Sequence, residues 1–163
     1  MKPKPRGGRI AKPPRFRAAR RAHPAGSGYR LEEQIGHVLR RAHQRHTALF
    51  ARQIGAAALT PAQWAALFKL HELGTASQSQ LGRLTAMDAA TLQGLVRRLI
   101  QRGLVAQRQD AADRRRNALR LTRAGAALVA ACLPDARRIT RLTLAPLSPA
   151  ERKTLVRLLR RLT

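Results

Sequence analysis

Three consecutive arginines, Arg114, Arg115 and Arg116, are the strongest candidates for binding chemistry in this sequence. Their guanidinium groups repel one another, so a folded protein rarely places three together unless an anion binds there. Guanidinium groups hold phosphate oxygens with paired N–H donors, and one or two of them fit a narrow DNA minor groove. Asp110 and Asp113 could pair with these arginines and direct the loop. We expect the run to contact a polyanion; a flexible charged loop without a partner is the alternative.

Residues 88–102 hold a second candidate site, on one face of a predicted helix. Asp88 is placed to cap this helix, and Gly103 is placed to end it. The apolar residues share one face: Leu92, Leu95, Val96, Leu99 and Ile100. The opposite face carries small and polar residues: Ala90, Gln93, Gly94, Arg97 and Gln101.

This polar face has the residue types that read base edges in a DNA major groove. Gln bonds adenine and Arg bonds guanine through two hydrogen bonds each, and the small Ala90 lets the backbone approach. We expect Gln93 to contact a base and Arg97 to contact a base or a phosphate. Thr91 lies near enough to meet a phosphate or a thymine methyl group, and Arg98 is counted with these DNA contacts. A solvated helix face is the alternative, and it would be favoured for an isolated helix.

The segment Ser77-Gln78-Ser79-Gln80 has the pattern of a capping box, which starts a short helix before residues 88–102. Ser77 and Ser79 open that helix, where a DNA phosphate could meet the helix N-terminus. Both serines are therefore expected among the DNA contacts.

A different set of side chains could bind a small acid. His46 falls near the apolar stripe of the first predicted helix, where its imidazole could meet a carboxylate or phenol, and Trp64 could stack on a ring. His37, Arg40 and His43 are the other candidates. Core packing is the favoured alternative for each residue taken alone. His43 and His46 could share a metal ion, but no cluster of acids or cysteines completes such a site, so we expect no metal and no cofactor.

The elements that position these residues are mainly helical. Apolar residues recur at helical spacing from Leu31 to about Ile54. A capping box with Pro at the first helical position, Thr60-Pro61-Ala62-Gln63, starts a helix that ends near Gly74. The short helix after Ser77 and the helix over residues 88–102 follow.

The period then changes from helix to strand. Residues 104–108 and 118–122 alternate as two strands around the polar loop that holds the arginines. A long helix over residues 123–144, kinked at Pro134, and a last helix opened by Ser148-Pro149-Ala150-Glu151 complete the chain. The expected fold class is mainly α with a small β-hairpin wing, the winged helix-turn-helix arrangement.

The charge balance favours an anionic partner. The chain has 163 residues, with 33 Lys and Arg against 8 Asp and Glu, for a net charge of +25. This excess indicates nucleic acid or an anionic membrane surface. No apolar run approaches the ~18 residues of a membrane span, and the N-terminus lacks the apolar core of a signal peptide, so we expect a cytoplasmic protein without membrane contact.

Other function classes find little support. The sequence contains no nucleophile elbow, P-loop, dinucleotide fingerprint or paired acids, and 8 acids leave little for acid–base catalysis. We therefore expect no enzyme. The alternative to a sequence-specific regulator is an architectural protein that binds DNA nonspecifically. An affinity that falls steeply with salt concentration and depends little on DNA sequence would distinguish it.

Five motifs, in their order and spacing, resemble the MarR family. They are Thr60–Trp64, Leu104–Arg108, Asp110–Arg115, Leu121–Gly125 and Leu147–Glu151, and the resemblance covers roughly residues 31–163. It implies a homodimeric regulator, in most cases a repressor, that dimerises through its first helix and its last two. It also implies that Arg114 and Arg115 enter the minor groove.

The sequence departs from the family pattern at three positions. Ala111 stands where Pro is common, Arg116 where a small residue is usual, and Arg97 where an acid is frequent. These departures make this protein more basic and leave the operator sequence open.

The resemblance also implies a small aromatic acid bound between the dimer helices and the DNA-binding lobe. The basic, proline-containing N-terminus and the first helix with its three histidines resemble repressors of nicotinate breakdown. A hydroxylated pyridine carboxylate is thus one inducer among several.

The expected organisation is a disordered basic tail (1–30) and one MarR-like domain (31–163). The tail holds ten Lys or Arg and no acid. The domain divides into a DNA-binding lobe (57–122) and dimerisation helices (31–56 and 123–163). Nothing else in the chain can cover the amphipathic terminal helices, so we expect a homodimer on double-stranded DNA, with pseudo-palindromic half-sites about one helical turn apart.

Overall fold

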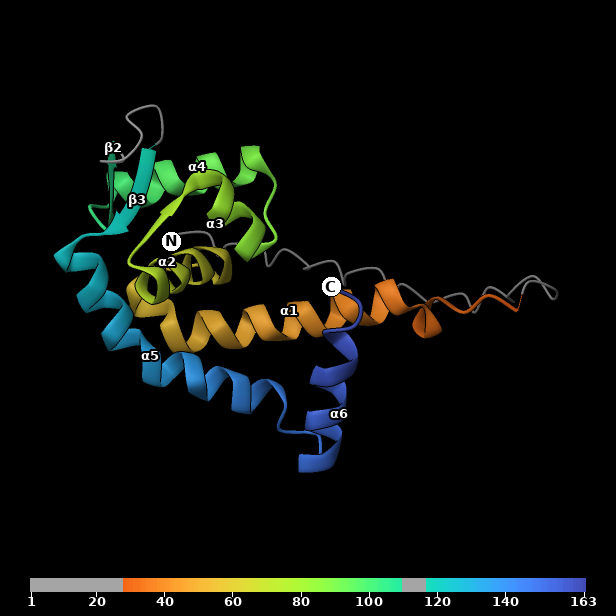
Figure 1. The fold of residues 1–163 in the computed structure, drawn as a ribbon. Coiled ribbons are helices and arrows are strands. Elements are labelled where there is room, and N and C mark those ends of the chain that lie inside the picture. The colour runs from red at the N-terminus through yellow and green to blue at the C-terminus, as the bar shows by residue number, and fades with distance from the viewer. Residues whose placement is uncertain (1–27, 110–116) are drawn as a thin grey trace, which may run out of the picture.

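The computed structural model describes residues 28–109 and 117–163. Figure 1 shows a lobe of helices and a small sheet, which lies against a long arm formed by helices α1 (Ile35–Ile54), α5 (Arg123–Thr143) and α6 (Pro149–Leu159). Helix α1 runs along the base of the lobe, and α5 packs against it. Helix α6 turns away from the end of α5.

Short turns bracket the first long helix. A 3-10 turn at Leu31–Glu33 precedes α1, and another at Gly55–Ala57 follows it. We predicted continuous helix from Leu31, and that was wrong by one turn because Gln34 is extended, with φ −77° and ψ 126°.

The lobe contains α2 (Pro61–Leu73), α3 (Gln78–Thr85) and α4 (Ala89–Gln101). Its sheet contains β1 (Thr75–Ser77), β2 (Val105–Gln109) and β3 (Asn117–Leu121). The strand order is β1-β3-β2 and both pairings are antiparallel. The two predicted hairpin strands are present, each within one residue of its expected bounds. Strand β1 was not predicted, because three residues carry no readable alternation.

Side-chain caps start the helices where the sequence predicted. Thr60 Oγ1 accepts from the Gln63 backbone at 3.2 Å, and Gln63 Oε1 accepts from the Thr60 backbone at 2.9 Å. Ser148 and Glu151 form the same reciprocal box before α6. Each box satisfies backbone N–H groups that would otherwise lack partners.

The core joins the lobe to the arm. Its fully buried large side chains are aliphatic, as the 3% aromatic content requires: Leu67, Leu70, Leu81, Leu92, Leu99, Leu119, Val129 and Ile139. Phe50 and Ile54 extend it into the end of α1. Ile100, predicted on the buried face of α4, is 36% exposed, because it falls at the edge of that face.

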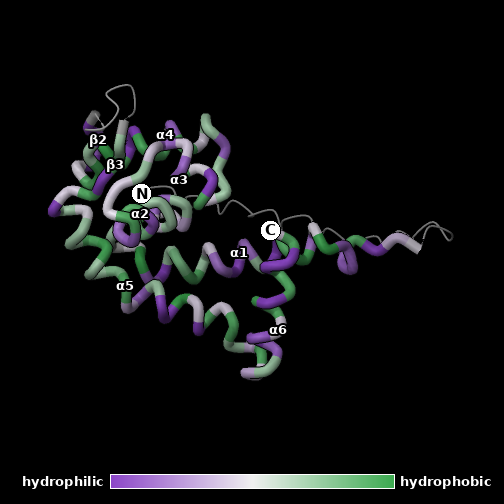
Figure 2. Tube along the Cα trace, in the orientation of Figure 1, coloured by the Kyte–Doolittle hydropathy of each residue, from purple (hydrophilic) through white to green (hydrophobic). Residues whose placement is uncertain are grey.

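The far end of the arm leaves apolar side chains uncovered. Ile35 is 64% exposed and Val38 45% exposed on α1, and Leu158 is 43% exposed on α6. Figure 2 shows hydrophobic stretches on both helices away from the lobe. Hydrogen bonds fix α6 to the connection that follows α5. Arg152 Nε, on α6, donates to the carbonyls of Leu144 and Leu147 at 3.0 and 2.8 Å. Among the described residues, no helix is long and apolar enough to cross a membrane.

Candidate DNA-binding surface

Helix α4 presents a polar face to solvent because its apolar face is fixed in the core. Leu92, Leu95, Val96 and Leu99 are buried, which turns the opposite side outward. Ala90, Gln93, Gly94 and Arg97 line a hollow of about 300 Å³ on that outer side. Four of the five residues that the sequence placed on one face therefore share a concave patch, which we call the α4 patch, and Gln101 is not among its lining residues.

The other two predicted contacts on α4 also face solvent. Thr91 and Arg98 are both exposed. Thr91 lies in the first turn, and its backbone N–H donates to Asp88 Oδ1 at 2.9 Å. That hydrogen bond is the main cause that lowers the pKa of Asp88, so the carboxylate stays ionised at the positive end of the helix. The start of α4 is thereby fixed.

The start of α3 brings Ser77 and Ser79 together. Their hydroxyl oxygens lie 3.1 Å apart, and Ser77 Oγ also accepts from the Gln80 backbone at 3.1 Å. Ser77 is half-buried and serves as the helix cap, whereas Ser79 is exposed. Ser79 is thus the better placed of the two to meet a phosphate.

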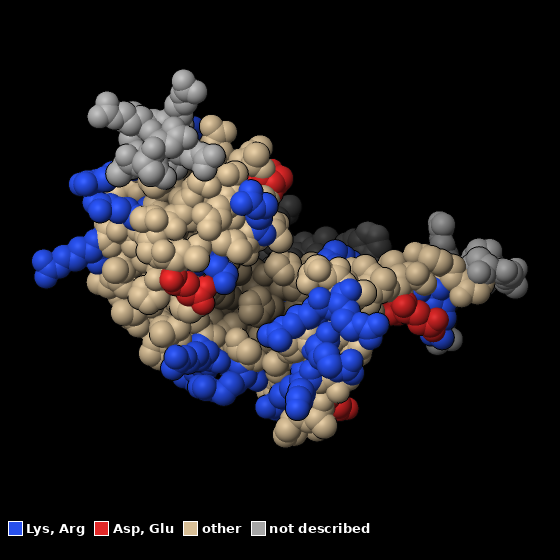
Figure 3. Space-filling view, viewed as in Figure 1, with Lys and Arg blue, Asp and Glu red and all other residues tan. Residues whose placement is uncertain are grey.

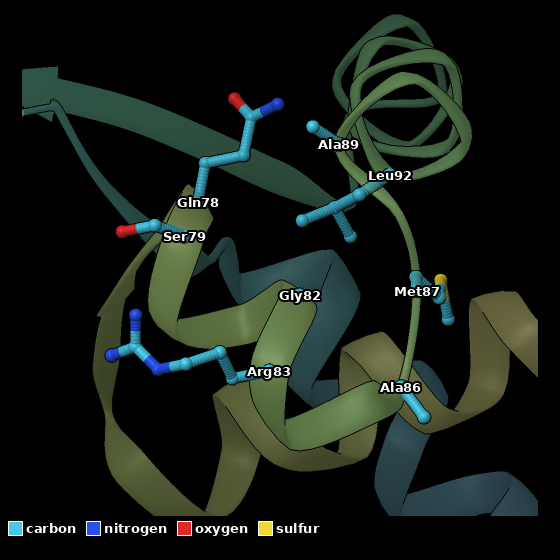
Figure 4. A pocket seen from close by; sticks show the side chains of 8 residues that line it. All are labelled: Gln78, Ser79, Gly82, Arg83, Ala86, Met87, Ala89 and Leu92. Carbon is cyan, nitrogen blue, oxygen red and sulfur yellow. The ribbon is translucent and has the colours of Figure 1, made fainter.

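A cavity of about 620 Å³ lies between α3 and the start of α4. Figure 4 shows Gln78 and Ser79 at the first turn of α3, with Arg83 one turn further on. Gly82 permits the close approach of α3 to the turn before α4, since a Cβ there would lie 3.2 Å from the Met87 carbonyl oxygen. Gln78 and Arg83 were not predicted as part of this site, although the four-residue spacing from Ser79 to Arg83 could have indicated a shared face.

The strands on either side of the arginine loop are part of the described structure. Strands β2 and β3 pair from Val105 opposite Leu121 to Gln109 opposite Asn117. The residues between these ends, 110–116, lie outside the described part of the chain, and with them the predicted contacts Arg114, Arg115 and Arg116. Asp110 and Asp113 lie outside it too.

Basic side chains dominate the surface. Figure 3 shows Lys and Arg spread over the lobe and the arm, with few acids among them. Within the described residues only two ion pairs form, Arg30 with Glu33 and Lys69 with Glu72. The surface therefore carries a strongly positive potential that attracts a polyanion.

The predicted ligand residues are partly brought together on α1. His37 Nδ1 lies 3.3 Å from Arg40 Nη2, while His43 is exposed. His46 Nδ1 lies 3.0 Å from Thr143 Oγ1 on α5. Burial first, and the nearby His43 second, lower the pKa of His46, so its imidazole is neutral near pH 7.

The predicted ligand residue Trp64 lies on α2, in the lobe, and not on α1. Trp64 is half-buried and stacks on Phe68, with ring centres 5.5 Å apart. Thr47 Oγ1, next to His46, is buried without a hydrogen-bond partner among the described residues, and sequence reasoning gave no signal for it. No group of three metal-ligating side chains occurs in the described part of the chain.

Comparisons with known proteins agree on one family. Residues 59–116 match the MarR family. The transcriptional repressor NicR of Pseudomonas putida is 43% identical over 82% of this chain and 85% of its own length. A protein of Pseudomonas aeruginosa described as a probable transcriptional regulator is 54% identical, with a TM-score of 0.79, over 82% of this chain and all of its own. BpsR of Bordetella bronchiseptica, whose DNA binding is regulated by 6-hydroxynicotinic acid, is 43% identical, with a TM-score of 0.79, over 83% of this chain and 97% of its own.

Proposed function

This chain belongs to the MarR family, and we propose on that premise that it is a homodimeric transcriptional repressor that leaves its operator when a small aromatic acid binds. The observation that carries this proposal is the α4 patch, where Gln93 and Arg97 share one exposed hollow with the small residues Ala90 and Gly94. We expect this regulator in the cytoplasm, where bacterial DNA lies, and without catalytic activity.

We place α4 in the major groove, with the α4 patch against the base edges. The small Ala90 and Gly94 allow the helix to enter deeply, and Gln93 and Arg97 supply bidentate contacts to adenine and guanine. Ser79, Thr91 and Arg98 lie toward the phosphates on either side and set the register. Arg114 and Arg115 follow β2 in the chain, and we assign them to the adjacent minor groove.

The exposed apolar side chains of the arm support a homodimer. Side chains such as Ile35, Val38 and Leu158 stand uncovered on two helices of the same arm. Apolar side chains grouped on a surface commonly mark an interface with another protein. In a symmetric dimer, a second copy of the arm would cover them with the same apolar face. The proposed division is therefore a lobe over residues 57–122 and dimerisation helices over residues 31–56 and 123–163.

The ligand site is proposed on α1. His37 and Arg40 lie within hydrogen-bond reach of one another, and a carboxylate could take both as partners. The similarity to NicR and to BpsR makes a hydroxylated pyridine carboxylate the first ligand to test.

The test is DNA release by 6-hydroxynicotinic acid. We expect saturating ligand to weaken binding to a labelled operator fragment by about tenfold or more in fluorescence anisotropy, a common size for allosteric coupling. Arg40→Ala should bind DNA as before and lose this response, whereas the matched control Arg45→Ala, on the same helix, should keep it. An equal response from both variants would overturn the assignment of the ligand site.

A further inference from the structure

The C-terminal end of α4 is tied to the turn that follows α1. Arg102, the residue after α4, donates from Nη1 to the Ala58 carbonyl and from Nη2 to the Ala57 carbonyl, both at 2.8 Å. Ala58 has φ 47°, a left-handed conformation that residues other than glycine rarely adopt. The planar guanidinium reaches both oxygens at once with donors held in a fixed plane, a preorganised geometry that the flexible ammonium of a lysine lacks.

The same end of α4 also contacts the start of α5, at its N-cap residue Thr122. Thr122 Oγ1 donates to the Gly103 carbonyl at 2.6 Å, and the Thr122 backbone donates to the Leu104 carbonyl at 3.1 Å. A Cβ at Gly125 would overlap the Leu104 carbonyl oxygen, so α5 approaches with no spare room. Residues 102–104, which we call the α4 exit turn, therefore contact the turn that follows α1 and the start of α5.

This arrangement couples the arm to α4. Helices α1 and α5 pack against one another, so a shift between them changes the two supports of the α4 exit turn relative to each other. A helix of 13 residues moves as a rigid rod, and a tilt at its end displaces the α4 patch. Resting on the function proposed above, we propose that Arg102 is a positioning residue that sets the tilt of α4 and passes changes in the arm to the α4 patch.

A direct contact between Arg102 and a DNA phosphate is the rival explanation. The two roles differ in their salt dependence. Each phosphate contact contributes about 0.9 to the slope of log affinity against log salt concentration, so loss of such a contact lowers the slope and weakens all DNA alike. Loss of a positioning contact weakens the base contacts and leaves the slope unchanged.

The test compares Arg102→Ala, Arg102→Lys and the control Arg138→Ala, which removes an exposed arginine from α5. Binding is measured on an operator fragment and on a scrambled fragment over a range of salt concentrations. We expect Arg102→Ala to lose about tenfold in operator affinity, the size of one bidentate base contact, with little change on scrambled DNA and an unchanged slope. Arg102→Lys should restore only part of the loss. Equal losses on both fragments with a lower slope, or no loss at all, would overturn the proposal.

A second readout needs no DNA. Hydrogen exchange of the free protein should speed up in the last turn of α4 and at residues 57–60 in Arg102→Ala, and stay unchanged in the middle of α2. Unchanged exchange at the end of α4 would be enough to show that the hydrogen bonds of Arg102 to Ala57 and Ala58 do not hold this helix end. If the unmodified protein shows no preference for any DNA sequence, the proposed function fails, while hydrogen exchange still decides the role of Arg102 in holding α4.

Discussion

At the scale of single residues, Gln93 carries the most direct test of base recognition. It is exposed on the α4 patch and carries no charge, so its loss leaves the electrostatic attraction to DNA unaltered. Arg97 lies in the same hollow but combines both effects, since a guanidinium attracts phosphates as well as guanine. Substitution of the neutral Gln93 therefore tests base recognition without changing the electrostatic attraction to the phosphates.

We predict that Gln93→Ala weakens operator binding by about tenfold, because one bidentate base contact is worth ~1–3 kcal/mol. Binding to scrambled DNA should stay the same. Competition binding with the two fragments measures both quantities, and Gln44→Ala on α1 is the matched control. Equal affinity of Gln93→Ala and the unmodified protein for the operator would remove Gln93 from the base contacts.

His46 gives the fold a pH dependence of known sign. Its folded-state pKa lies below the ordinary value of 6.5, chiefly because of burial. As the pH falls below 6.5, the unfolded chain takes up a proton before the folded protein does, so stability falls until the pH passes the folded-state pKa. The stabilising contribution is fully present above the ordinary pKa.

We predict that His46→Gln flattens the decline in stability between pH 6.5 and the lower pKa of the folded state. The substitution should also lower stability near pH 7, because the contact with Thr143 is altered. Urea unfolding at several pH values measures both effects, with His71→Gln as the control for the substitution itself. A decline as steep as that of the unmodified protein would show that His46 is not its cause.

At the scale of elements, the hairpin and its loop form a unit whose strands are described and whose arginines are known only from sequence. The pairing of β2 with β3 reaches Gln109 and Asn117, so the seven residues 110–116 join two fixed ends. Arg114 and Arg115 belong to that connection. Their assignment to the minor groove stays a prediction.

We predict that the double substitution Arg114→Ala and Arg115→Ala weakens DNA binding by well over tenfold and lowers the salt slope by roughly 1 to 2, as expected for the loss of up to two ionic contacts. The dimer should stay intact, which light scattering measures. The paired control is Arg137→Ala with Arg138→Ala on α5, which removes the same charge elsewhere. Unchanged DNA affinity in the first variant would contradict the wing assignment.

The helices were predictable because their signals are local. Caps at Thr60, Ser77, Asp88 and Ser148 stand at helix starts, and the apolar period of α4 gave the side that faces solvent. The polar residues of the α4 patch could be grouped for the same reason.

The remaining features depend on contacts between distant segments. Strand β1 exists because β3 pairs with it, and three residues carry no signal of their own. The tie from Arg102 joins residues 44 and 45 positions apart, so no local pattern could indicate it. The buried Thr47 hydroxyl likewise follows from how the arm packs, and not from its neighbours in sequence.

At the scale of the whole molecule, the exposed apolar face of the arm implies that the single chain is half of the working unit. Leu155 and Leu158 are 37% and 43% exposed on α6. Buried against a second copy, they would each contribute stabilisation of ~1–2 kcal/mol at about 25 cal/mol per Å² of apolar area.

We predict that Leu155→Glu with Leu158→Glu yields a monomer in light scattering and lowers operator affinity by at least tenfold, because two half-sites are then bound independently. Leu73→Glu, a change of the same kind on an exposed leucine at the end of α2, should leave the dimer intact. A dimer that survives the double substitution would place the interface elsewhere.

The most direct test of the central claim is selection of genomic DNA fragments by the purified protein at ~150 mM salt, where nonspecific attraction between charges is screened. The account predicts a short pseudo-palindromic consensus with half-sites about one helical turn apart. Retention of DNA without any consensus would contradict it and would favour a protein that binds DNA through charge alone.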